Sequence, residues 1–323
     1  MFLWAVALLG LMGAPMLLSD RAWAKDYFVN TLEDKVTPVA DTEDPEVGYL
    51  KDGYLSLREA MLLANASKGV KDTITFKVSG VIIVGSFGGS HGGMALPTIE
   101  DPVIIDGTSA PGYQTGQPAV ELHGQNTYMS YGTGLFTLAD GCEFRGLGIK
   151  NFPGSGVVLY SSNNTIEANS IQGNGGGIVS SAESANKILD NDITDNYNDG
   201  LLITGDPTVL TNGINNLVQG NRILRNASHG VEITSTGSQI LDNVIADNGG
   251  NGVWISGHWV QGILVGRNFI GTDQYGTPGL GNGQNGVLVS GGSDDAIQSN
   301  VISGNGGHGV YLIDSASHNT IGG

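Results

Sequence analysis

The stretch LDNVIADNGGNGVWI, residues 241–255, places Asn243, Asn248 and Asn251 within a run of apolar residues. Closely similar phrases occur at 189–203 (LDNDITDNYNDGLLI), 220–233 (GNRILRNASHGVEI) and 299–312 (SNVISGNGGHGVYL). A phrase that recurs along a chain indicates a repeat protein, in which every copy forms one structural unit that stacks on its neighbours.

When the phrases are aligned, a first asparagine recurs at spacings of 22, 30, 22, 25 and 32 residues: Asn169, Asn191, Asn221, Asn243, Asn268 and Asn300. A second polar residue follows five positions later in each unit: Asn174, Asn196, Asn226, Asn248, Asp273 and Asn305. Apolar residues stand three before and two after the first asparagine, and a later glycine in each unit precedes a short alternating strand. A unit of about 22 residues with two or three short strands and no helical segment fits one coil of a parallel β-helix.

An asparagine buried alone is costly, because an unpaired amide in a core costs a few kcal/mol. In a β-helix each coil lies about 4.8 Å above the last, so identical side chains stack and each amide can hydrogen-bond the amides above and below it. We therefore expect both series of asparagines to form structural ladders rather than to bind a ligand.

Residues 1–24 contain a long apolar segment and end with Ala22-Trp23-Ala24, a pattern that predicts a cleaved secretory signal peptide. The alternative is an uncleaved membrane anchor, because no Lys or Arg precedes the apolar segment. Either interpretation predicts a secreted, periplasmic or cell-surface protein. The single cysteine, Cys142, has no partner within the chain and is expected to be a buried free thiol.

The remainder of the chain is expected to form an N-terminal section over 25–74 and a β-helix over 75–323, with regular coils over 141–323. The segment LSLREAMLLANAS has apolar residues at helical spacing, with Ser56 and Glu59 as a capping box, and predicts a short helix that closes the N-terminal end of the β-helix. The last residues, HNTIGG, stop in mid-repeat, which predicts a truncated C-terminus.

The formal net charge is −17, which disfavours contact with nucleic acid or anionic lipid and is compatible with calcium or neutral glycans. No second long apolar segment follows the leader, so we expect no membrane span after signal cleavage. We also expect a monomer. The histidines show no spacing typical of metal ligands: His91, His123, His229, His258, His308 and His318.

Several segments resemble those of a known family. DGYLSLREAMLLANAS, then ITF, ALPTI and VIIDGTSAPGY, then the N-x-I-x-x-N coils, are similar to secreted bacterial β-helix proteins with an N-terminal SLREA-type motif, within the pectate-lyase-like superfamily. Leu55 stands where that motif often has a cysteine. The resemblance implies an all-β, right-handed, single-stranded parallel β-helix of about ten coils. The superfamily includes polysaccharide lyases, hydrolases and glycan-binding adhesins, and fold alone does not choose among them.

Alternation after each glycine predicts one outward residue per coil: Val158, Val179, Leu202, Glu232, Trp254, Leu288 and Tyr311. Just ahead of these strands stand Asp199, His229, Asn251 and His308. We expect Asp199, His229, Glu232 and Trp254 to form one carbohydrate-binding patch, because a sugar ring can stack on an indole while carboxylates bind hydroxyls. The insertions at 204–215 and 256–262 would form walls around this patch. The alternative is that these are unrelated surface residues.

A second column reads Asp195, Arg225 and Asp247 on consecutive coils, with Asp190, Asp192, Arg222 and Asp242 close by in sequence. The simplest interpretation is a ladder of surface ion pairs. The alternative is a lyase site, in which carboxylates hold calcium against a uronate and Arg225 abstracts a proton. The calcium candidates are Asp190, Asp192, Asp195, Asp242 and Asp247.

Motifs of polygalacturonases are matched poorly, because Asp294-Asp295 precedes His308 by only 13 residues, less than one coil, and their Asn-Thr-Asp and Arg-Ile-Lys elements are missing. The leading hypothesis is a secreted or cell-surface protein that binds polysaccharide or another surface partner without chemistry. The alternative is a polysaccharide lyase or glycoside hydrolase that acts on polyuronate in a lateral groove. Its catalytic candidates are Asp199, His229, Glu232 and Arg225, with no cofactor required and calcium possible.

Overall fold

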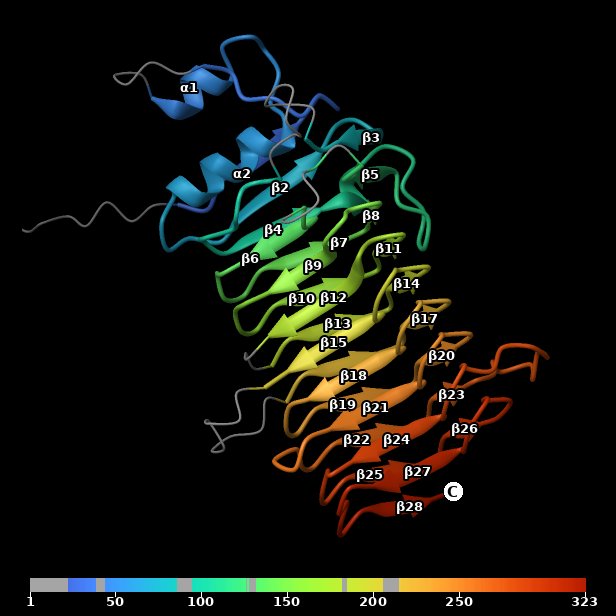
Figure 1. Ribbon diagram of the computed structural model, residues 1–323. Helices are drawn as coiled ribbons and strands as arrows, with labels where there is room; N and C mark the ends of the chain where they lie inside the picture. Colours follow the sequence, from blue (N-terminus) through green and yellow to red (C-terminus); the bar gives the residue numbers. More distant parts are fainter. Residues whose placement is uncertain are drawn as a thin grey trace, which may run out of the picture.

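The computed structural model describes residues 23–38, 44–85, 95–125, 127, 132–181, 185–205 and 215–323. Within them, three parallel sheets run side by side along the molecule, and the neighbours in each sheet come from successive coils (Figure 1). The chain is therefore a parallel β-helix, as predicted. Residues 1–22, which hold most of the predicted signal peptide, lie outside the described residues.

The first sheet has eleven strands: β1 (Asp26–Val29), β2 (Asp72–Phe76), β4 (Val103–Asp106), β7 (Glu143–Arg145), β10 (Thr165–Glu167), β13 (Lys187–Leu189), β16 (Leu217–Gln219), β19 (Gln239–Leu241), β22 (Leu264–Gly266), β25 (Ala296–Gln298) and β28 (Thr320–Gly322). The second has nine: β3 (Gly80–Ile83), β5 (Val120–His123), β8 (Leu147–Lys150), β11 (Ser170–Gln172), β14 (Asp192–Thr194), β17 (Arg222–Leu224), β20 (Val244–Ala246), β23 (Phe269–Ile270) and β26 (Val301–Ile302). The third has eight: β6 (Leu135–Thr137), β9 (Ser155–Leu159), β12 (Gly176–Ser181), β15 (Leu201–Thr204), β18 (Val231–Thr234), β21 (Val253–Ser256), β24 (Val287–Ser290) and β27 (Val310–Ile313).

Stacked columns of β-branched and other apolar residues fill the space between the sheets. The inward column of the first sheet is buried along its length: Phe144, Ile166, Ile188, Val218, Ile240, Val265 and Ile297. All of these except Phe144 are the positions three before the first asparagine, so the predicted inward orientation of those six is confirmed. Branched side chains suit such columns because they pack well on a pleated surface.

The asparagine ladders are confirmed. Asn243 is fully buried, its Oδ1 accepts from the backbone N and the Nδ2 of Asn221 at 2.9 and 3.0 Å, and its Nδ2 donates to Asn268 Oδ1 and Val218 O, each at 3.0 Å. The same bonds join the rungs of the first ladder: Asn169, Asn191, Asn221, Asn243, Asn268 and Asn300. The side-chain amides of this ladder find their hydrogen-bond partners in the coils above and below, and asparagine can therefore be buried here without leaving a polar group unpaired.

One predicted rung of the second ladder is wrong. The ladder runs through Asn174, Asn196, Asn226, Asn248, Asn282 and Asn305. Asn282 thus replaces Asp273, because nine residues are inserted between the strand and the turn of that coil. Asp273 instead closes a turn in the insertion by accepting from the backbone N–H groups of Tyr275 and Thr277 at 2.9 and 3.0 Å.

A third column, which the repeat analysis missed, stands just ahead of the strands of the first sheet. Its members are Cys142, Asn164, Asn186, Asn216, Ser238, Ile263, Asp295 and Asn319. Asn164 donates its Nδ2 to Asn186 Oδ1 at 3.0 Å, as in the other ladders. Cys142 is a buried free thiol as predicted, and burial raises its pKa.

The N-terminal end of the stack is covered by helices α1 (Pro45–Tyr49) and α2 (Leu57–Ala66), and a short 3₁₀ turn, η1, spans Gly107–Ser109 (Figure 1). The predicted capping box is confirmed, since Glu59 N–H donates to Ser56 Oγ at 3.2 Å and Ser56 N–H donates to Glu59 Oε2 at 2.9 Å. Because α2 contacts β1 and β2, it closes this end of the core as expected. The division of the chain at residue 74 stays a prediction.

Candidate functional site

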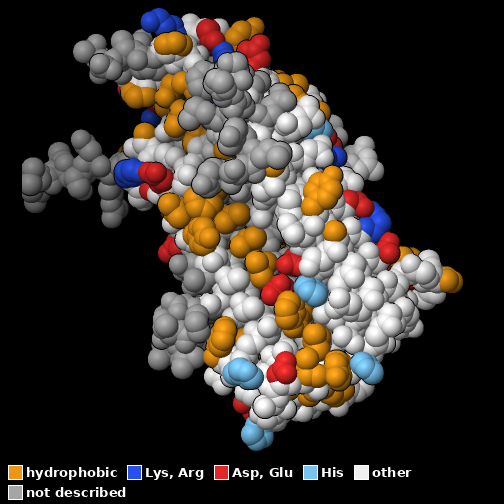
Figure 2. Space-filling model, viewed as in Figure 1, with side chains coloured by type: hydrophobic (Ala, Val, Ile, Leu, Met, Phe, Trp, Pro, Cys, Tyr) orange, Lys and Arg blue, Asp and Glu red, His pale blue; other side chains and the backbone are white. Residues whose placement is uncertain are grey.

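The outer face of the third sheet carries the predicted outward column in the expected register. Glu232 on β18 pairs with Leu202 on β15 and with Trp254 on β21, and Trp254 pairs with Leu288 on β24. Figure 2 shows a band of apolar side chains along this face, interrupted by acidic and histidine side chains. The face therefore combines apolar surface with a few titratable groups.

A column of polar side chains stands just ahead of the strands of the third sheet. Each of these side chains accepts a hydrogen bond from the backbone of the next coil. His229 N–H donates to Asp199 Oδ1 at 2.8 Å, and Asn251 N–H donates to His229 Nδ1 at 2.9 Å. The pattern continues as Asn285 N–H donates to Asn251 Oδ1 at 3.0 Å and His308 N–H donates to Asn285 Oδ1 at 2.9 Å. The chain thus fixes the orientation of Asp199 and His229 by ordinary coil stacking.

The four predicted patch residues lie together. One ligand atom from each of Asp199, His229 and Glu232 lies within 4.8 Å of the others. The rings of His229 and Trp254 are 4.8 Å apart and tilted by 54°. The indole Nε1–H of Trp254 is buried and has no hydrogen-bond partner.

The environment of this cluster changes how its members titrate. Burial, together with neighbouring Asp199, raises the pKa of Glu232 to about 7, because both disfavour a second negative charge. Burial lowers the pKa of His229, with Asp199 opposing the shift. The backbone N–H of Asn251 can only donate, so Nδ1 of His229 must accept and the neutral ring carries its proton on Nε2. His229 is thus a neutral donor rather than a base at neutral pH.

The cluster is the one group of three potential metal ligands within the described residues. Its geometry does not suit a histidine-ligated transition metal. A metal on Nε2 would require the proton to move to Nδ1, where it would face the Asn251 N–H, whereas metal-ligating histidines normally donate from their second nitrogen. The cluster is therefore not proposed as a transition-metal site, and calcium binding stays a prediction.

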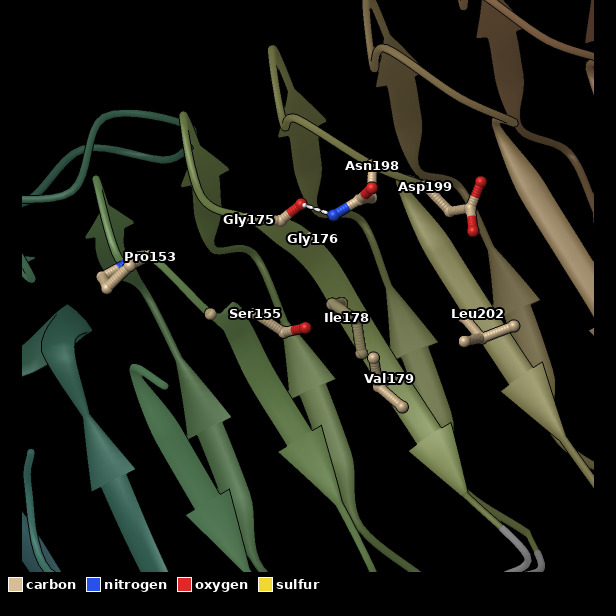
Figure 3. Close-up of a pocket in the computed structure, with 10 residues that line it drawn as sticks. Pro153, Ser155, Gly175, Gly176, Ile178, Val179, Asn198, Asp199 and Leu202 are labelled. Atoms are coloured by element: carbon tan, nitrogen blue, oxygen red, sulfur yellow. Dashed lines mark hydrogen bonds between the residues drawn. The ribbon is translucent and has the colours of Figure 1, made fainter. Parts of the chain in front are cut away.

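A cleft of about 300 Å³ opens beside Asp199 (Figure 3). It is lined by Pro153, Gly154, Ser155, Gly175, Gly176, Ile178, Val179, Asn198, Asp199 and Leu202. Asn198 Nδ2 donates to Gly175 O at 2.7 Å across its upper end (Figure 3). Of the predicted walls, 206–214 lies outside the described residues, whereas Trp259 in the loop after β21 donates to Thr234 O at 3.3 Å and so stands beside the end of β18.

The column that includes Asp195 and Arg225, together with nearby charged residues, forms ion pairs. Arg225 binds Asp195 through two bonds of 2.7 and 2.8 Å, Arg222 binds Asp192 at 2.6 Å, and Arg267 binds Asp242 at 2.8 Å. The hydrogen bond to Asp195 raises the pKa of Arg225, which opposes its use as a proton acceptor. Positive φ values explain four of the aspartates, because Asp tolerates the left-handed turn: Asp190, Asp195, Asp242 and Asp247. Arg225 also has a positive φ, which does not explain its residue type. The calcium and lyase roles of this column stay predictions.

Residues 133–277 match the family described as "Right handed beta helix region". The match does not reach the SLREA-type segment, so that part of the resemblance stays a prediction. A search of curated protein sequences found no match.

Three solved structures show the same architecture at low sequence identity. Pectate lyase Pel9A is 17% identical with a TM-score of 0.52, and the alignment covers 91% of this chain and 79% of that one. The A-module of mannuronan C-5 epimerase AlgE4 from Azotobacter vinelandii is 18% identical with a TM-score of 0.51, over 93% of this chain and 86% of that one. A mutant of the periplasmic alginate epimerase AlgG is 14% identical with a TM-score of 0.50, over 79% of this chain and only 60% of that one. Together with the three parallel sheets, these matches show that the chain is a right-handed parallel β-helix.

Proposed function

We propose that this is a secreted, periplasmic or cell-surface protein that binds polysaccharide on the outer face of its third sheet without catalysing a reaction. The observation that carries the proposal is the cluster of Asp199, His229, Glu232 and Trp254 at the edge of an open cleft. An aromatic ring beside a few fixed polar groups, in a concave and mostly uncharged surface, is the usual composition of a sugar site.

Each group in the cluster has a defined part in such binding. Asp199 already accepts one backbone N–H and has further lone pairs for a hydroxyl, while Nε2 of His229 offers a donor and the ring of Trp254 offers a surface for stacking. The contact between His229 and Trp254 holds the indole in place, so little side-chain entropy is lost on binding.

The proposed location rests on the leader-like residues 1–24. In the part of the chain that the structure describes, no helix has the length and apolarity needed to cross a membrane. A structural neighbour of the same fold is named as periplasmic, which is compatible with export of this chain.

A second candidate function is cleavage of a polysaccharide, as a lyase or a glycoside hydrolase. It is favoured by Glu232, whose pKa of about 7 leaves much of it protonated at neutral pH beside the carboxyl group of Asp199. A carboxylic acid poised in this way can protonate a leaving oxygen while its neighbour acts as a carboxylate. A polyuronate is the substrate predicted for this alternative.

The test is to incubate the protein from residue 25 onward with soluble neutral and acidic polysaccharides, with calcium and with a chelator. Retention in affinity electrophoresis reports binding, while unsaturated products and new reducing ends report cleavage. Trp254→Ala should weaken retention by about fivefold or more, because stacking contributes about 1 kcal/mol beyond buried area. Tyr311→Ala is the matched control, since it removes an outward aromatic from the same column two coils away.

The variants Asp199→Asn, His229→Ala and Glu232→Gln separate the two functions. Modest loss of affinity in each, with no product from the parent, supports binding. Product that disappears in Glu232→Gln while retention remains supports catalysis, since a proton donor acts mainly in the transition state. Absence of both retention and product in the parent protein would refute the proposal.

A further inference from the structure

We infer that the groove selects an uncharged polysaccharide over a polyuronate, and that the bound chain runs from the Asp199–His229–Glu232 cluster across Pro153 to Tyr197. The inference rests on the proposed function and names the substrate class of that same site.

A second cleft, of about 210 Å³, continues the first one. It is lined by Gln125, Thr127, Asn151, Phe152, Pro153, Gly173 and Tyr197. Pro153 lines both clefts, so they meet on this residue. Tyr197, Asn198 and Asp199 are consecutive, and they line the second cleft, the first cleft and the cluster in turn. A continuous path therefore leads from the cluster to the ring of Tyr197.

Tyr197 is an exception in its own column. The equivalent positions, six residues after each first asparagine or one after Asn282, are Gly175, Tyr197, Ala227, Gly249, Gly283 and Gly306. Stacking of the coils favours glycine at this position, because a Cβ would lie 2.2 to 2.5 Å from a backbone oxygen of the preceding coil. This holds for Gly175, Gly249, Gly283 and Gly306.

The Tyr197 side chain is 75% exposed, so it adds little to the core. An exposed aromatic placed where stacking of the coils favours the smallest residue is best explained by contact with a ligand.

The charges on this path indicate the kind of chain it accepts. Neither cleft is lined by a Lys or an Arg, and the Asp, Glu and His side chains on the path are Asp199, Glu232 and His229. A uronate unit beside Asp199 would bring two negative charges together without a cation in a partly buried site, which is unfavourable.

The nearest arginines in sequence, Arg222 and Arg225, are bound to Asp192 and Asp195. The remaining lining groups are amides, hydroxyls, backbone and apolar surface. Asn151, Asn198 and Ser155 thus match the hydroxyl groups of a neutral sugar. This inference does not follow from the fold, because pectate and mannuronan, named for the structural neighbours, are acidic polymers.

The experiment compares retention on neutral polymers (galactomannan, arabinoxylan and mixed-linkage glucan) with retention on polygalacturonate and alginate. It is run with calcium and with a chelator, and also in high salt, which screens the general repulsion due to the net charge of −17. Tyr197→Ala is compared with Tyr275→Ala, which removes a ring that is 82% exposed but lines neither cleft.

We expect at least one neutral polymer to be retained more strongly than either polyuronate in every buffer, and Tyr197→Ala to weaken this retention by about fivefold or more while Tyr275→Ala leaves it unchanged. Stronger retention of a polyuronate that is sensitive to Trp254→Ala would overturn the substrate class and leave the proposed function standing. Equal effects of Tyr197→Ala and Tyr275→Ala would overturn the path. No retention of any polymer would remove the proposed function together with this inference. Unchanged circular dichroism of both variants confirms that the fold is intact.

Discussion

Replacement of Asp295 by asparagine should stabilise this protein at neutral pH. Asp295 is 1% exposed and belongs to the third buried column, in which asparagine is the commonest residue. Its Oδ1 accepts from Ile263 N–H at 2.8 Å, but its Oδ2 is buried without a hydrogen-bond partner. Burial raises the pKa of this carboxyl group from 3.8 to about 6. An asparagine would place an N–H donor where the unpaired oxygen stands.

The magnitude follows from linkage between protonation and folding. The folded-state pKa lies about 2 units above the unfolded value, and each unit corresponds to about 1.4 kcal/mol, so ionisation of Asp295 costs the folded state up to about 3 kcal/mol. Because the folded pKa is raised, no cost exists below pH 3.8, the cost grows between pH 3.8 and about 6, and it is complete above that range. Asp295→Asn removes it, and we expect a gain of about 1 to 3 kcal/mol at neutral pH.

Urea unfolding followed by circular dichroism measures the free energy of unfolding of the parent and of Asp295→Asn at about pH 7.5 and about pH 4. The gain in stability should be large at about pH 7.5 and small at about pH 4. Asp294→Asn is the control, because it removes an adjacent but exposed carboxyl group and should change stability little at either pH. A gain of equal size at both pH values, or a loss at neutral pH, would refute the assignment of Asp295 as a buried acid that is costly to ionise.

Three further predictions concern the ladder, the cluster and the leader. Asn243→Leu should destabilise the protein by about 1 to 3 kcal/mol for each partner left unsatisfied, and an unchanged melting temperature would remove the ladder argument. Glu232→Gln should raise the melting temperature above pH 7 and have little effect below pH 4.5, because its folded pKa is raised from 4.5 to about 7; thermal melts across this range that show no pH dependence would contradict the shift. The mature chain should begin near Lys25, and intact mass measurement on exported protein that still carries residues 1–24 would exclude cleavage.

The ladders were predictable because a β-helix places one residue of each coil directly above the equivalent residue of the last. Any side chain that must hydrogen-bond its own kind therefore recurs in the sequence, and Asn169 to Asn300 could be read from spacing alone. The rule failed at Asp273 because counting five residues assumes a turn of constant length, whereas that coil carries an insertion before Asn282. The third column was missed because its residue types vary from Asn164 to Ile263 and Asp295.

The candidate site was predictable in part. Alternation after each glycine gave the outward column correctly, so Glu232 and Trp254 were expected on neighbouring strands and are paired there. The proton position on His229 was not readable from sequence, because it depends on the direction of the Asn251 N–H. The cleft beside Asp199 depends on which neighbouring residues are small, which no single position in the sequence reveals.

The residues that depart from their columns indicate where function has been added to the scaffold. Most positions in a column repeat one residue type because stacking demands it, so an unlike residue marks either a local structural need or a contact with something else. Tyr197 departs from a column of glycine and alanine. Glu232 and Trp254 depart from a column of valine and leucine, as do Phe136 and Tyr311 nearer the two ends of the sheet. Tyr197, Glu232 and Trp254, with Asp199 and His229, belong to the coils of β15, β18 and β21, which are adjacent in the third sheet. Asp295 also departs from its column, but it is buried inside the stack and lines neither of the two clefts described above. Outward departures that gather on three successive coils are what a ligand site requires, whereas an isolated inward departure affects stability alone.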